Sequence, residues 1–119
     1  MEIHIIDDKR LGEIKSEFSK YFPFLKLEFF KHAHNNGLGS PKEDMIVEDL
    51  VLGDIRTIHN EGDIVIRDDM EVGLLEQKFE SKYGIHVQIF RKSGDIWLET
   101  SATDNWTLKE QNLTGLEMG

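Results

Sequence analysis

Two histidines separated by one residue, His32 and His34, come nearest to a chemically recognisable pattern in this sequence. They lie where a strand-like segment enters a loop, and alternate residues of a strand point the same way. Two imidazoles and a carboxylate form a common metal-ligand set, and Glu43 or Asp44 could supply the oxygen. An H-x-H pair has low specificity, however, and solvated histidines at a strand end explain it more simply. We therefore expect no metal and no other cofactor, and His32 and His34 are the residues to test.

Other catalytic patterns are not defined by spacing. Gly37 and Gly39 stand in GLGSPKED, which lacks the G-x-x-x-x-G-K-[ST] spacing of a phosphate-binding loop. Serine, threonine, histidine and aspartate are all present, but no spacing forces a nucleophile next to a base. The sequence thus names no catalytic residue and favours a function without catalysis.

Composition excludes several classes of function. The chain has 119 residues, which predicts one domain over 1–119, and a net charge of −9, which opposes binding to nucleic acid. It contains no cysteine, and therefore no disulfide or thiolate site. It has no apolar run long enough for a membrane span, and its first residues, MEIHIIDDKR, do not resemble a signal peptide. We expect a cytoplasmic protein that binds neither nucleic acid nor membrane.

Hydrophobic periodicity predicts alternating strands and helices. Apolar residues at helical spacing predict helices over 9–21 and 71–83, and a shorter helix within 45–60. Thr107 and Glu110 have the spacing of a capping box, which predicts a C-terminal helix. The predicted strands are 2–6, 26–33, 63–67, 85–92 and 95–100, the last two joined as a hairpin around Ser93–Gly94.

This order of elements resembles the ferredoxin-like α+β sandwich over residues 2–100. The resemblance implies an antiparallel sheet with two main helices on one face, here with an added hairpin strand and short extra helices. It rests on element order alone, and no motif of a functional family accompanies it. The fold class therefore implies no function.

One face of such a sheet is open unless something covers it. Alternation predicts that one set of side chains faces the helices: Ile3, Ile5, Leu25, Leu27, Phe29, Ile64, Ile66, Ile85, Val87, Ile89, Ile96 and Leu98. The opposite set is His4, Ile6, Glu28, Phe30, His32, Val65, His86, Gln88, Phe90 and Trp97. Three aromatics on an open face are unusual, since large exposed apolar patches mark interaction sites.

The sequence is compatible with four ways of covering this sheet face: by the C-terminal segment 104–119, by a second copy of the chain, by another protein, or by a small ligand in an aromatic-lined cavity. We expect a small interaction or regulatory protein that binds through Phe30, Phe90 and Trp97, with Gln88 and His86 beside them, either as a homodimer or with another protein. The alternative is a ligand-binding protein or enzyme that uses a cavity lined by histidines and aromatics on the same face, with or without a metal.

Overall fold

The computed structural model describes residues 1–33 and 38–118, so His34 lies outside the described residues. The protein is an α+β fold with helices α1 (Leu11–Tyr21), α2 (Val72–Tyr83) and α3 (Leu108–Met118). The predicted helices 9–21 and 71–83 are confirmed, and α2 ends at Gly84, whose φ of 64° is left-handed. In the described part of the chain, no helix combines the length and apolarity that crossing a membrane requires.

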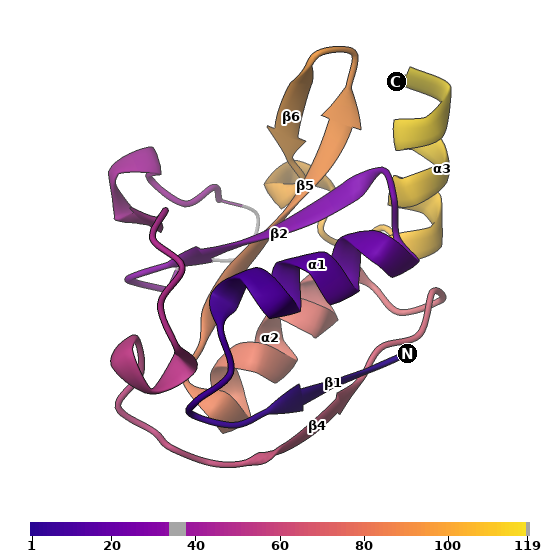
Figure 1. Ribbon diagram of the computed structural model, residues 1–119. Coiled ribbons are helices and arrows are strands. Elements are labelled where there is room, and N and C mark those ends of the chain that lie inside the picture. The colour runs from indigo at the N-terminus through magenta and orange to yellow at the C-terminus, as the bar shows by residue number, and fades with distance from the viewer. Residues whose placement is uncertain (34–37, 119) are drawn as a thin grey trace.

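The strands form two antiparallel sheets (Figure 1). The larger has the order β3-β2-β5-β6, and the smaller pairs β1 with β4. The larger sheet contains β3 (Met45–Ile46), β2 (Leu25–Phe30), β5 (His86–Ser93) and β6 (Ile96–Glu99); the smaller contains β1 (Glu2–Ile5) and β4 (Gly62–Val65). The predicted hairpin is present, with β5 and β6 joined at Gly94–Asp95.

The ferredoxin-like arrangement in a single sheet is not confirmed. β1 pairs only with β4, and β2 pairs directly with β5 along its whole length, from Leu25 opposite Arg91 to Phe30 opposite His86. Element order does not determine which strands pair, because pairing depends on which apolar faces meet in the core. Here Leu27 meets Ile89 and Phe29 meets Val87, which gives β2 and β5 a continuous apolar seam.

The core lies between the helices and one face of each sheet. Ten of the twelve side chains predicted to face the helices are buried there, including Ile3, Leu27 and Ile89. Ile96 and Leu98 lie on the same face by register, opposite Ser93 and Arg91, but they are 59% and 38% exposed and not part of the core. These two side chains belong to β6, whose only strand neighbour is β5, at the edge of the sheet.

The predicted helix within 45–60 is wrong. That segment contains the short strand β3 and a single 3-10 turn, Leu52–Asp54. Apart from short-range turn bonds, its backbone bonds to residues 7–11: Leu11 N donates to Leu50 O, and Leu52 N donates to Lys9 O. Because these long-range partners satisfy the peptide groups, a helix at this position gains nothing.

The C-terminal helix packs on the helix side of the larger sheet. The capping box is confirmed, since Thr107 N donates to Glu110 and Glu110 N donates to the Thr107 hydroxyl. Leu108 enters the core, and Gln111 accepts a hydrogen bond from Arg91, which shares its face of β5 with Ile89. The C-terminal segment therefore does not cover the aromatic face that the sequence predicts.

Candidate interaction edge at strand β6

The larger sheet has an outer face that points away from α1 and α2. By the observed register it carries Lys26, Glu28, Phe30, His86, Gln88, Phe90, Lys92, Trp97 and Glu99. The expected aromatic surface is only partly present there, because Phe30 and Phe90 are 2% and 7% exposed while Trp97 is 37% exposed. Of the three predicted anchors, only Trp97 can therefore contact a partner without rearrangement.

The segment 38–41 supplies part of the cover over this face. The Ser40 hydroxyl, which is buried, lies 3.5 Å from Gln88 Oε1, and Gln88 is fully buried. Gly39 lies against the Glu99 carboxylate so closely that a side chain at position 39 would overlap Oε2. Gly39 and Ser40 thus lie over the sheet, a cover that the sequence analysis did not consider.

Trp97 is held in place by a lysine from the central strand. Lys26 Nζ lies 5.2 Å from the centroid of the Trp97 ring and 5.4 Å from that of Phe90. An ammonium group at this distance is attracted to an aromatic face. Trp97 also pairs across the ladder with Lys92. The exposed indole therefore lies beside two lysines, on a face that also carries Glu28 and Glu99.

The backbone of β6 has a free edge. Thr100 N donates to Ile89 O, and Lys92 N donates to Phe24 O on the opposite side of β5. In an antiparallel ladder these directions alternate, so the N–H and C=O groups of Trp97 and Glu99 point away from β5. No partner for these four groups occurs within the described residues. An edge of this kind can accept another strand.

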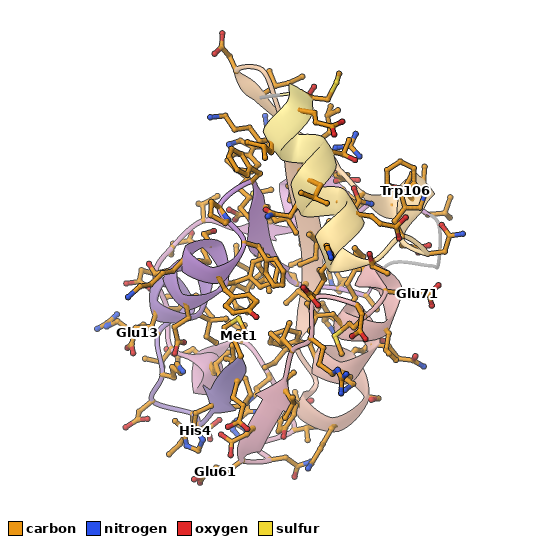
Figure 2. The ribbon with its side chains drawn as sticks, turned by 90° about the vertical axis from the view of Figure 1, so that its right-hand side faces the viewer. Met1, His4, Glu13, Glu61, Glu71 and Trp106 are labelled. Carbon is orange, nitrogen blue, oxygen red and sulfur yellow. The ribbon has the colours of Figure 1, made fainter. Side chains whose placement is uncertain are left out.

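Apolar side chains are exposed on this strand and in the residues that follow it. All four residues of β6 are exposed, and three of them are Ile96, Trp97 and Leu98. The C-terminal turn of α3 lies beside the hairpin, where Gly94 N donates to Met118 O, as Figure 1 shows near the C-terminus. More than half of the exposed large apolar side chains in the described chain fall between Ile96 and Met118. Trp106 at the start of α3 is among them (Figure 2).

The histidines are dispersed over the molecule. Each of the four described histidines approaches a carboxylate: His4 with Asp63, His32 with Asp44, His59 with Asp7, and His86 with Glu80. His4 also points toward Glu61, at the tip of the small sheet (Figure 2). Among the described residues no three potential ligands converge as a metal site would require. His86 lies on the outer face, where its buried Nδ1 has no hydrogen-bond partner.

A second polar cluster surrounds a buried arginine. The Arg56 side chain is fully buried and donates from Nε and Nη2 to Asp7 Oδ1, at 3.1 and 2.7 Å. The remaining Asp7 oxygen lies 2.8 Å from His59 Nδ1. Hydrogen bonding from Arg56, the largest effect, lowers the pKa of Asp7 below its ordinary value of 3.8; burial opposes it, and hydrogen bonding from His59 adds to it. This cluster anchors a loop, and sequence spacing does not reveal it.

One cleft of about 630 Å³ opens near β3, lined by Lys31, Ile46, Glu48, Leu50, Asp54, Ile55, Arg56 and Thr57. Ile46 pairs with Phe29, whose side chain points to the core, so this cleft does not lie on the outer face. Its lining contains no histidine and no aromatic residue. The cleft is therefore different from the cavity that the sequence analysis expects for a ligand.

Comparisons with protein-family models, with curated proteins and with solved structures found no match to this chain.

Proposed function

We propose that this protein is a small, non-catalytic interaction protein that binds another protein chain through the free edge of β6. The bound segment adds as a further strand of the larger sheet, and Trp97 contacts it from the outer face. In this mode the backbone groups provide affinity and the side chains provide specificity. The observation that carries the proposal is an edge strand that combines unpaired backbone groups with exposed apolar side chains on both faces.

The residues around β6 support this mode over a non-specific apolar contact. Soluble proteins usually protect edge strands with charges, bulges or proline. Here β6 has neither proline nor a bulge in its pairing with β5, and Glu99 is its single charge. Trp97 is an aromatic residue of the type that dominates interface energetics. Phe30, Phe90 and Gln88 then support the sheet from below this surface, instead of contacting the partner directly.

A peptide selection tests this function. Random ten-residue peptides displayed on phage would be selected against the wild-type protein, and the selected peptides would be titrated into isotopically labelled protein. We expect the largest chemical-shift changes at the amides of Trp97 and Glu99, because those N–H groups become paired. Trp97→Ala should weaken binding by about tenfold or more, since a buried interface aromatic contributes at least 1–2 kcal/mol.

A matched pair of variants isolates the role of the strand edge. Glu99→Ala and Glu99→Pro both remove the carboxylate, but only proline removes the outward N–H group. Proline is tolerated on strand edges, so the fold should persist in both. Peptides should bind Glu99→Ala and fail to bind Glu99→Pro. Selected peptides that bind both variants equally, or that shift resonances only outside 96–99, would sink the proposal.

A further inference from the structure

We infer that the strand accepted by β6 is β6 of a second copy, paired antiparallel about a two-fold axis at Leu98. This inference rests on the proposed function and names its partner. The result is one continuous eight-stranded sheet with the order β3-β2-β5-β6 in each half. Symmetric pairing of identical edges is a common route to dimers, since one surface then contacts itself.

Hydrogen-bond directions restrict the register. Only Trp97 and Glu99 present outward N–H and C=O groups, and β6 is four residues long. An axis at Ile96 would pair β6 with the hairpin turn at Gly94–Asp95. An axis at Glu99 would pair it with the 3-10 turn Ser101–Thr103. Two symmetric registers remain, one centred on Trp97 and one centred on Leu98.

Charge separates these two registers. Centring on Trp97 places Glu99 of each copy directly opposite Asp95 of the other, and like charges in that position are destabilising. Centring on Leu98 places Glu99 opposite Trp97 of the second copy. Trp97 is itself opposite Lys92 of its own chain, so Glu99, Trp97 and Lys92 form one row of side chains across the strands. Lys26, which lies over the Trp97 ring, borders this row. A carboxylate of the second copy therefore comes near the two lysines beside each indole.

The other face of the same register is apolar. Leu98 meets its own copy across the axis, and Ile96 lies two residues away on the same side. These side chains are exposed in the single chain, because α3 packs mainly on β5 and β2 of this face. Dimer formation thus buries two apolar side chains that a single chain leaves exposed.

The absence of cysteine allows a direct test by single-cysteine crosslinking. In the Leu98-centred register, position 98 forms a pair without mutual hydrogen bonds, whose Cα atoms are about 4.5 Å apart, within the range for a disulfide. Leu98→Cys, Trp97→Cys and Leu74→Cys would each be oxidised with glutathione disulfide, which accepts the two electrons released when two thiols join. Leu74 is exposed on α2, far along the chain from β6, and reports random collision.

We expect Leu98→Cys to form covalent dimers at least about tenfold faster than Leu74→Cys, because pairing raises the effective thiol concentration. Faster crosslinking of Trp97→Cys than of Leu98→Cys overturns the register. Equal rates for Leu98→Cys and Leu74→Cys overturn the dimer. The peptide selection tests the proposed function separately. If peptides bind at Trp97 and Glu99 but none of the cysteine variants forms covalent dimers, the edge of β6 binds a different protein. In that case the dimer is ruled out and the proposed function stands.

Discussion

Replacing Arg56 by alanine is expected to lower the free energy of unfolding by about 3 kcal/mol, because a fully buried guanidinium with three charge-assisted hydrogen bonds is removed. Arg56 joins the loop before β4 to two distant places. It binds Asp7 after β1, and its Nη1 donates to the carbonyl of Tyr83, the last residue of α2. A cation at a helix C-terminus is also favoured by the helix dipole.

Arg67→Ala provides the matched control. Arg67 forms an ion pair with Asp69, but both side chains are exposed, so this change should alter stability by less than about 0.5 kcal/mol. Denaturant unfolding of the three proteins gives the comparison. Equal stabilities of the two variants would show that Arg56 does not hold the loop.

The same contact has a pH signature. The pKa of Asp7 is lower in the folded protein than its ordinary value of 3.8, chiefly because of the hydrogen bonds from Arg56. Its contribution to stability is therefore fully present above that ordinary value and is lost as the pH falls through the lowered folded pKa. In Arg56→Ala, the loss of stability on acidification below about pH 4 should become smaller.

Replacing Gly115 by valine is the second change with a large expected effect. A Cβ at this position would lie 2.8 Å from Phe24 Cβ and 2.9 Å from the Phe24 carbonyl oxygen. The carbonyl belongs to the backbone and cannot move aside, so α3 must shift away from the sheet. Overpacking of this kind typically costs about 1–3 kcal/mol, and we expect the upper end of that range because α3 also carries Leu108 into the core.

Gly115→Ala and Glu117→Ala make this prediction specific. Alanine favours a helix over glycine by about 1 kcal/mol, so an isolated helix would be stabilised by Gly115→Ala. In this protein the contact with Phe24 should cancel or reverse that gain. Glu117→Ala, on the exposed side of the same helix, should change thermal stability little. A Gly115→Val variant as stable as the wild type would show that α3 is not closely packed on Phe24.

Local patterns predicted much of the fold because they concern neighbouring residues. Helical spacing located α1 and α2, Gly84 marked the end of α2, and Thr107 with Glu110 marked the start of α3. Alternation assigned nearly all the core residues of β1, β2, β4 and β5. These signals require no knowledge of which elements meet.

Long-range pairing was not predictable from the same signals. The helical spacing of Leu52 and Ile55 has a local interpretation, but the backbone of that segment bonds to residues 7–11. Asp7 binds Arg56, and the first turn of α1 receives Asp49 from a distant loop. Both contacts depend on tertiary proximity.

The candidate site was predicted in part. The open face and Trp97 follow from alternation, but the burial of Phe30 and Phe90 does not. The residues that could have revealed the edge strand are Ile96 and Leu98, which are apolar and yet exposed. Apolar residues on both faces of a short final strand indicate that the strand lies at an edge. This interpretation would have identified β6 as the edge strand of the sheet.

Static light scattering across a concentration series tests the central claim most directly, with wild type, Glu99→Ala and Glu99→Pro compared at physiological ionic strength. Salt matters because each copy carries a net charge of −9, and screening limits repulsion to about 8 Å. The wild type should approach the mass of two chains as concentration rises, Glu99→Ala should do so less readily, and Glu99→Pro should stay at the mass of one. A Glu99→Pro variant that dimerises as readily as Glu99→Ala would contradict binding through the edge of β6.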